Sequence, residues 1–199
     1  EIVVISTQSG LQVCDLHSGA QLHSLKGNNG VDSQASLCLA VEANGFQKLD
    51  QMYILSCQGT KSLLNTWWIH KQQPIHRSPT PERLWCLELS KSLDFVVGGG
   101  ASGHCFIWDR ASGELINTWP AHYRKATVLR FTDDDNFIVS GGEDSIVNVW
   151  SLVDVASSSF VGRIRDKNVS ARWHMSAHTL PITDIQCGAG SNGLIYSSS

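Results

Sequence analysis

The stretch GGEDSIVNVW, residues 141–150, decides the fold of this chain. Its glycines and acids form a polar turn, and residues 146–150 then run through branched aliphatic side chains to a tryptophan. This pattern predicts a β-strand that is entered through a tight turn. The acid on the turn, Asp144, fits either a catalytic role or a structural one. Recurrence of the pattern elsewhere in the chain distinguishes the two.

The pattern recurs along the 199 residues. Tryptophans close similar runs in LLNTWW, HCFIWD and IVNVWS, at Trp68, Trp108 and Trp150, so the steps are 40 and 42 residues. Near the N-terminus, LQVCDLHSGAQL shares an Asp and a Ser-Gly pair with CFIWDRASGELI at equivalent positions. A period of about 40–45 residues, with four short strands in each unit and a Trp-Asp signature, is typical of β-propeller blades.

The sequence therefore predicts an all-β fold that resembles a WD40 β-propeller. We expect it to be the N-terminal portion, about four and a half blades, of a seven-bladed ring, because each blade buries its faces only against its neighbours. No helical periodicity exceeds two turns. The expected units are residues 1–27, a first blade of three strands; 28–78; 79–121; 122–176, with an insert at 157–172; and 177–199, the start of a fifth blade.

The fourth unit carries the side chains of the hydrogen-bonded tetrad found in WD40 blades: His122, Ser140, Asp144 and Trp150. In that network the acid, the imidazole, the hydroxyl and the indole N–H satisfy one another inside the blade. Asp144 is therefore interpreted as a structural acid. His178 opens the next unit in the same way, and Ser197 is its expected hydroxyl partner.

The other units depart from this tetrad. The residues six and ten places before Trp108 are Ser102 and Gly98, and the same offsets before Trp68 give Ser62 and Gln58. Trp68 and Trp108 are thus expected to be structural repeat tryptophans that rely on apolar packing.

Composition and motifs give no sign of chemistry. The formal net charge is −3, and no apolar run reaches the ~18 residues of a membrane span. The six cysteines show no metal-binding spacing and favour reduced thiols in a nuclear or cytosolic protein. The Gly-rich stretch VVGGGASGHC precedes no helix, so it fits a turn better than a phosphate loop. We expect no catalytic, metal or cofactor site and no membrane contact.

Two groups of residues have no explanation in the blade pattern. The first comprises the candidate partner contacts Trp85, Tyr123, Arg124 and Lys125, although Trp85 is equally compatible with the core. The second is a basic loop within the insert, with Arg163, Arg165, Lys167 and Arg172. That loop is either idle or an electrostatic contact with rRNA phosphates or an acidic partner.

Four stretches carry a closer resemblance: VCDLHSGAQL, FVVGGGASGHCFIWDRASGELINTWPAHYR, FIVSGGEDSIVNVWSL and SAHTLPITDIQCGAG. In this order and spacing they resemble the WD40 subfamily of the fungal Ipi-three protein and its animal counterpart, WD-repeat protein eighteen. The resemblance implies a non-catalytic subunit of the Rix complex, which matures the large ribosomal subunit in the nucleus and nucleolus. It also implies internal-transcribed-spacer processing and, as partners, a helical-repeat scaffold subunit, the midasin AAA ATPase and the pre-60S particle.

Competing interpretations stay open at the level of sequence. WD40 propellers also serve as substrate receptors of ubiquitin ligases, and the subfamily has been linked to replication licensing on chromatin. An enzyme with its site at the centre of the ring would need convergent His, Asp or Glu residues at the strand starts, and none is evident. A homodimer formed through a further C-terminal segment is a further expectation of the resemblance.

Overall fold

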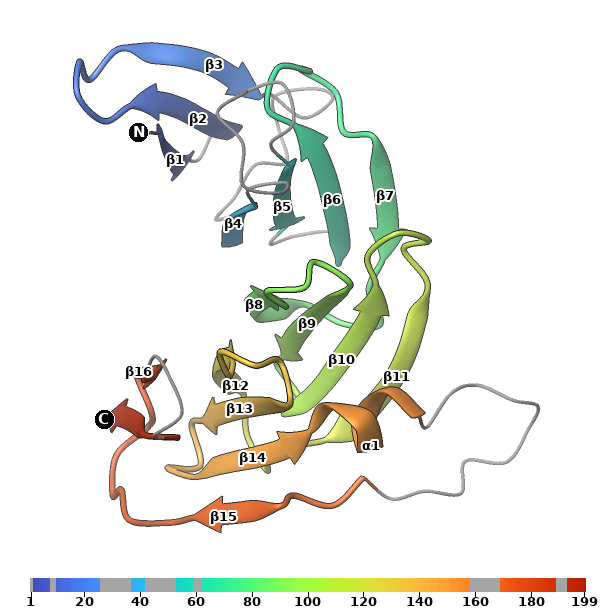
Figure 1. The fold of residues 1–199 in the computed structure, drawn as a ribbon, viewed down its shortest axis with the longest axis vertical. Helices are drawn as coiled ribbons and strands as arrows, with labels where there is room; N and C mark the ends of the chain where they lie inside the picture. The colour runs from blue at the N-terminus through green and yellow to red at the C-terminus, as the bar shows by residue number, and fades with distance from the viewer. Residues whose placement is uncertain are drawn as a thin grey trace. The chain divides into compact units, whose positions relative to one another are not determined.

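The computed structural model describes residues 2–7, 10–25, 37–41, 53–58, 62–157, 169–188 and 193–199. In these residues the chain forms five antiparallel sheets and one short helix (Figure 1). The described fold is therefore almost entirely β-structure. The chain divides into two compact units, Glu1–Leu84 and Trp85–Ser199, and each is described by itself.

The first unit contains two sheets. The three-stranded sheet has the order β1 (Ile2–Thr7), β2 (Gly10–Asp15), β3 (Gln21–Leu25). The four-stranded sheet has the order β4 (Leu37–Val41), β5 (Tyr53–Gln58), β6 (Leu63–Trp68), β7 (His76–Pro79). Their shared core is formed by Leu11, Val13, Leu25, Ile54, Trp67 and Ile69.

The second unit contains two four-stranded sheets and a two-stranded one. The first is β8 (Leu84–Leu89), β9 (Phe95–Gly100), β10 (His104–Asp109), β11 (Leu115–Pro120). The second is β12 (Ala126–Phe131), β13 (Phe137–Gly142), β14 (Val147–Ser151), β15 (Trp173–Met175). The last pairs β16 (Asp184–Cys187) with β17 (Ile195–Ser198). Consecutive strands pair in each sheet, which is a meander.

The sheet β12–β15 is covered on both of its faces. Leu129, Ile138 and Trp150 belong to a core shared with the sheet β8–β11. The residues next to them, Val128, Val139 and Val149, belong to a core shared with Ile182 and Ile185. Because successive side chains of a strand point to opposite faces, one sheet contributes to two cores. Sheets stacked in this way explain why central strands such as β10, β13 and β14 are buried at nearly every position.

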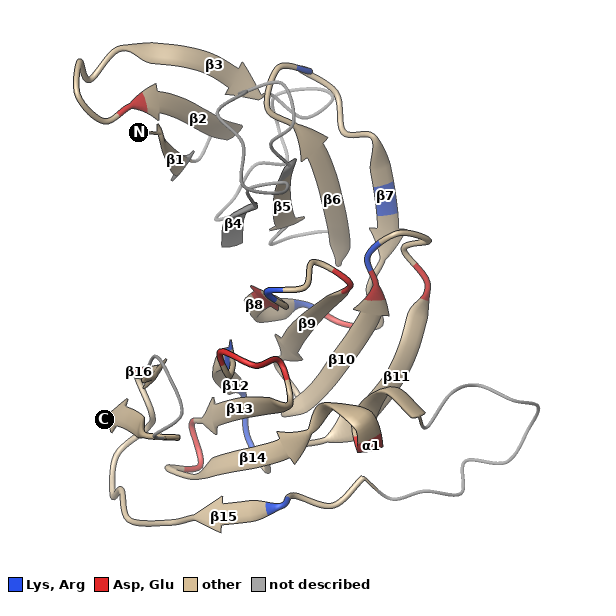
Figure 2. Ribbon diagram, viewed as in Figure 1, with Lys and Arg blue, Asp and Glu red and all other residues tan. Residues whose placement is uncertain are grey.

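Neighbouring sheets of the second unit are also tied at one end. The carboxylate of Asp135, on the turn between β12 and β13, accepts the backbone N–H groups of Lys91 and Ser92 at 2.9 and 2.6 Å. The side chain of Lys91 bonds Asp133 on the same turn. Figure 2 shows the acids of this turn in red. The turn is thus a contact between two sheets as well as a solvated hairpin tip.

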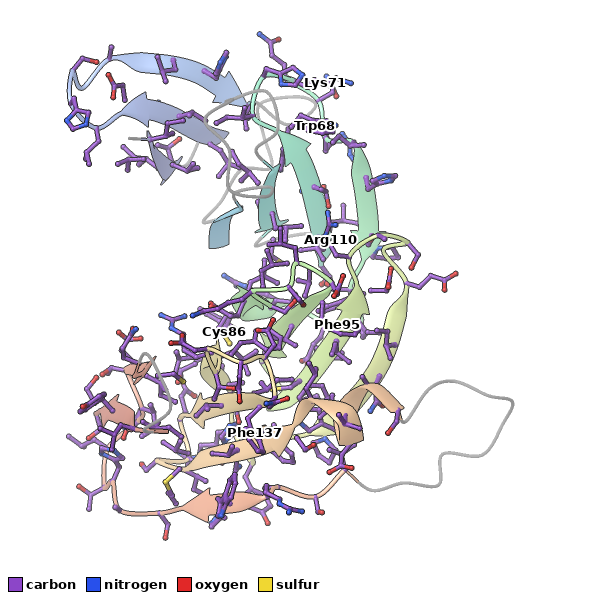
Figure 3. The ribbon with its side chains drawn as sticks, in the orientation of Figure 1. Trp68, Lys71, Cys86, Phe95, Arg110 and Phe137 are labelled. Atoms are coloured by element: carbon purple, nitrogen blue, oxygen red, sulfur yellow. The ribbon has the colours of Figure 1, made fainter. Side chains whose placement is uncertain are left out.

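The strand register places Trp67, and not Trp68, at the repeat position of the second sheet. Trp108 pairs with Val96, the second residue of β9, and Trp150 pairs with Ile138, the second residue of β13. In β6 the residue that pairs with the second residue of the preceding strand, Ile54 of β5, is Trp67. Trp68 stands at the end of β6 (Figure 3) and is less buried than Trp67, whose exposed fraction is 4 %. The sequence-based choice of Trp68 as the repeat tryptophan is therefore wrong by one residue.

The cause of this error is a longer turn. Ser140 pairs with Asn148, eight residues later, and the equivalent Ser56 pairs with Asn65, nine residues later. One additional residue between β5 and β6 shifts the tryptophan relative to its hydroxyl partner. The indole N–H of Trp67 accordingly donates to the Ser56 hydroxyl at 2.8 Å, so this sheet keeps the Trp–Ser half of the tetrad.

A short helix leads into the insert. α1 (Leu152–Ser157) follows β14 directly and buries Val155, whose backbone carbonyl accepts a hydrogen bond of 2.9 Å from Asn117 on β11. Near the end of the insert, Val169 and Ala171 pack against the same core. Residues 158–168, with Arg163, Arg165 and Lys167, lie outside the described residues. Arg172 is exposed, and its backbone N–H donates to Val149 at 2.7 Å.

Candidate functional site

The four predicted tetrad residues form one hydrogen-bonded chain. The Trp150 indole N–H donates to the Ser140 hydroxyl oxygen at 2.9 Å. Ser140 Oγ lies 2.8 Å from His122 Nε2, and His122 Nδ1 lies 3.0 and 3.2 Å from the two oxygens of Asp144. His122 and Ser140 are buried. This series of hydrogen bonds crosses from the loop before β12 to strands β13 and β14, so it ties together three segments of one sheet.

Burial determines the protonation of the imidazole. Desolvation lowers the pKa of His122, and the Asp144 carboxylate opposes this effect in part. A neutral imidazole then donates from Nδ1 to Asp144 and accepts the Ser140 hydroxyl hydrogen at Nε2. Every polar hydrogen of the four tetrad side chains has an acceptor in this arrangement, so the buried groups are satisfied.

The set Ser140, His122 and Asp144 has the connectivity of a hydrolase triad, but its environment is different. A nucleophilic serine must reach a substrate carbonyl. Ser140 is fully buried, and its oxygen is occupied by the Trp150 N–H. A Cβ added at Gly142 would lie 2.5 Å from Asp144 Oδ1 and 2.6 Å from His122 Nδ1, so the strand itself covers the acid end. The triad is therefore a structural network.

The last sheet repeats the beginning of this network. His178 Nε2 lies 2.7 Å from Ser197 Oγ, and His178 Nδ1 lies 3.0 Å from Ser199 Oγ. Ser197 pairs with Ile185 as Ser140 pairs with Leu129, so the two hydroxyls hold equivalent places. This arrangement agrees with the expected partnership of His178 and Ser197.

The loop of residues 121–125 contains His122 of the tetrad, and its two central residues, Tyr123 and Arg124, are exposed. Asp144 accepts the backbone N–H of Tyr123 at 3.0 Å. On the other side, the backbone N–H groups of Ala121 and His122 both donate to the carbonyl of Gly103, at 3.1 and 3.0 Å. Gly103 has φ of 89°, and a Cβ there would lie 2.2 Å from the His122 carbonyl oxygen. Only glycine permits this close approach.

The far end of the 121–125 loop is held by its own side chain. Lys125 Nζ lies 4.3 Å from the ring centroid of Trp85 and 2.5 Å from Glu143 Oε1. The Lys125 carbonyl also accepts the backbone N–H of Glu143 at 2.9 Å. Lys125 is thus engaged by an aromatic face and by a carboxylate. Trp85 retains 37 % exposure, which places it at the surface rather than in the core.

The remaining candidate contacts, Tyr123 and Arg124, project from this anchored backbone. The side chain of Tyr123 is 90 % exposed, and Arg124 is also exposed. Among the described residues, none forms an ion pair with Arg124. The structure thus brings all four candidate contacts to one surface. Trp85 and Lys125 contact each other there, whereas the side chains of Tyr123 and Arg124 project into solvent.

Three contributors to this site were missed by the sequence reasoning. Glu143 neutralises Lys125, and the Gly103 carbonyl supports the loop. Asn148 links the loop to β15: its amide donates to the Ala121 carbonyl at 2.8 Å, and its Oδ1 lies 2.8 Å from His174 Nδ1. A signal for Glu143 was its place beside Asp144 on the same turn. Gly103 and Asn148 gave none, since their roles depend on contacts between strands.

Metal binding and membrane insertion have no support in the described parts of the chain. No group of three or more His, Cys, Asp or Glu residues lies close enough there to hold a metal ion. No helix within them is long and apolar enough to cross a membrane. The buried Cys86 thiol donates to the Ala126 carbonyl, and burial raises its pKa to about 12, so it is an unreactive core thiol.

Comparison with known proteins identifies the repeat. A family model described as "WD domain, G-beta repeat" matches residues 113–151, the segment that contains the tetrad. The chain carries WD40 repeats. Its fold agrees with a chain in the crystal structure of the mitotic checkpoint complex, with a TM-score of 0.74, 15 % identity, and coverage of 99 % of this chain and 55 % of that one. The predicted all-β, partial WD40 propeller is thereby confirmed.

Sequence relatives of this WD40 chain share about 30 % of its residues over most of its length. Protein ROOT INITIATION DEFECTIVE 3 of Arabidopsis thaliana is 30 % identical, over 100 % of this chain and 44 % of that protein. Pre-rRNA-processing protein IPI3 of Meyerozyma guilliermondii is 32 % identical, over 90 % and 42 %. WD repeat-containing protein 18 of Danio rerio is 31 % identical, over 94 % and 41 %. The chain spans less than half the length of these relatives, and the predicted resemblance is confirmed.

Proposed function

We propose that this WD40 chain belongs to a non-catalytic scaffold subunit that acts in maturation of the large ribosomal subunit and in processing of its precursor rRNA. The observation that carries the proposal is the similarity to proteins named for pre-rRNA processing, which extends over nine-tenths of the chain. In this proposal the sheets are blades of a seven-bladed ring, and their boundaries are those expected from the sequence.

The packing supports a scaffold role. Central strands such as β10 and β14 are buried on both faces, so their side chains serve the fold. The Ser140, His122 and Asp144 set is enclosed within a sheet, where Ser140 and His122 are buried. Loops and outer strands are then left to recognise other molecules. A protein with this distribution of exposed groups is suited to binding partners.

The resemblance supplies the finer part of the proposal. The subunit would act within a Rix-type complex in the nucleus, together with a helical-repeat scaffold subunit and the midasin AAA ATPase on pre-60S particles. The basic loop within residues 157–172 is either idle or a contact with rRNA phosphates, and a segment outside this chain would offer a homodimer contact.

Affinity purification of the intact tagged protein at low salt tests this proposal. Co-purification of large-subunit assembly factors, with a matched unrelated WD40 protein as control, is the expected result. Recovery of cullin-type ligase components in their place would identify a ubiquitin-ligase receptor and overturn the ribosomal role.

Depletion of the protein provides a second, functional readout. Precursors that retain the internal transcribed spacer between the small and large rRNAs should accumulate relative to mature large-subunit rRNA. A normal precursor ratio after complete depletion would contradict the proposal.

A further inference from the structure

We propose that Tyr123 and Arg124 form a preorganised docking site for an extended segment of a partner protein that carries an acidic side chain beside an apolar one. This inference rests on the proposed role as a binding scaffold. It adds the chemistry that the scaffold recognises and the two residues that recognise it.

The backbone of the site is fixed before any partner arrives. Ala121 and His122 donate to Gly103, Tyr123 donates to Asp144, and Lys125 exchanges both a backbone hydrogen bond and an ion pair with Glu143. Binding to a fixed loop avoids much of the entropic cost of ordering it. An exposed tyrosine on such a loop has only two side-chain torsions left to restrict.

The charge of the site favours a carboxylate. Lys125 is neutralised by Glu143, and Asp144 accepts from His122 and from Tyr123. Arg124 is therefore the one cation of the 121–125 loop that no acidic residue of the described chain neutralises. A planar guanidinium pairs with a carboxylate through two parallel hydrogen bonds, which gives geometric selectivity.

The neighbouring ring supplies the apolar half of the site. Tyr123 is 90 % exposed and precedes Arg124 directly, so an apolar side chain next to the bound carboxylate can cover its ring. Tyrosine and arginine are enriched among the residues that dominate binding energy at protein interfaces. The partner segment should therefore present an Asp or Glu adjacent to a Leu, Phe or similar residue.

A protein partner fits this surface better than RNA. Binding of RNA depends on neutralising several phosphates and on aromatic faces that are free to stack. This surface has one unneutralised cation and includes the carboxylate of Glu143, and the face of Trp85 is occupied by Lys125. The formal net charge of the chain, −3, adds no attraction for a polyanion.

The test uses the intact protein and a random peptide library displayed on phage. Selection should enrich peptides in which an acid adjoins an apolar residue. For a synthetic peptide chosen from them, Arg124→Glu and Tyr123→Ala should each raise the Kd about tenfold or more. Arg77→Glu, which changes an exposed arginine on β7, is the matched control and should leave the Kd unchanged.

A charge exchange isolates the proposed pair. Replacing the acid of the peptide by Lys should abolish binding to the unaltered protein and restore it to Arg124→Glu. Circular dichroism of each variant confirms folding, since both altered side chains are exposed. The proposal is overturned by selection without an acidic preference, by a Kd that ignores Arg124, or by an oligouridylate that binds in an Arg124-dependent manner where the peptides do not.

The outcome is distinguishable from that of the ribosomal proposal. Peptide binding that depends on Arg124, combined with normal precursor rRNA after depletion, would support the docking site and reject the ribosomal role. Accumulated precursor rRNA without any such peptide binding would do the opposite.

Discussion

Asp144 accepts the backbone N–H of Tyr123 across 3.0 Å. The same carboxylate accepts from His122 Nδ1, at 3.0 and 3.2 Å from its two oxygens. One acid thus closes the buried tetrad and also fixes the 121–125 loop at Tyr123, where the side chain is exposed. The stability of the sheet and the geometry of its surface loop are coupled through this residue, because both donors bond to the same carboxylate.

Replacing Asp144 by alanine should destabilise the protein by about 1–3 kcal/mol, because it leaves buried donors without an acceptor. Denaturant unfolding of the intact protein measures this loss. The variant should also weaken peptide docking at Tyr123 and Arg124, since the loop backbone loses its anchor. Asp144→Asn, which retains one carbonyl acceptor, should lose less stability and less peptide affinity than Asp144→Ala. Unchanged stability of Asp144→Ala would refute the structural interpretation.

The stability of the protein should fall as the pH falls below about 6.5, the ordinary value for an unfolded histidine. Burial lowers the pKa of His122 in the folded state. Between the folded and unfolded pKa values the unfolded chain therefore binds more protons, so stability rises with pH across that window and is fully present above it. The unfolding midpoint at successive pH values measures this slope.

The assignment to His122 has its own check. An NMR titration of the His122 ring should give a midpoint below that of a histidine in an unstructured peptide. The variant His122→Gln should lose part of the pH slope. A midpoint above the peptide value would show that the charge of Asp144 outweighs desolvation, and the sign of the slope would reverse.

Replacing Arg163, Arg165, Lys167 and Arg172 together by serine should leave the affinity for rRNA unchanged. The formal net charge of −3 gives the chain no general attraction for a polyanion. Filter binding over a range of salt concentrations is the measurement, and Arg77→Glu serves as the control. If the segment contacts phosphates, the slope of log affinity against log salt will fall by about one unit for each lost contact, and the loss of affinity will be greatest at low salt.

The repeat and its tetrad were predictable because they are patterns within one chain segment. His122, Ser140, Asp144 and Trp150 stand at fixed offsets, and the structure joins them by hydrogen bonds. The alternation of apolar residues in β12–β14 likewise predicted strands. Sequence spacing suffices wherever turn length is constant.

The surface contacts were less predictable, since they depend on which segments meet. Nothing in the spacing of Trp85, Lys125 and Glu143 indicated that one ammonium would lie between a ring and a carboxylate. The register of β6 was also misread, because one additional turn residue shifts the tryptophan from the expected offset. A hydrogen bond to a hydroxyl, rather than residue counting, identifies the repeat position.

Trp67 and Trp68 should differ in their contribution to stability. Trp67 is 4 % exposed, packs with Leu11, Val13 and Ile54, and donates to Ser56 at 2.8 Å. Trp67→Ala should therefore cost about 3–5 kcal/mol of stability, by lost burial and a residual cavity, and Trp68→Ala clearly less. In a double-mutant cycle, Trp67→Phe and Ser56→Ala should be coupled, because each removes the same hydrogen bond. Trp68→Phe and Ser56→Ala should be additive, and a larger loss at Trp68 than at Trp67 would reject the register described for β6.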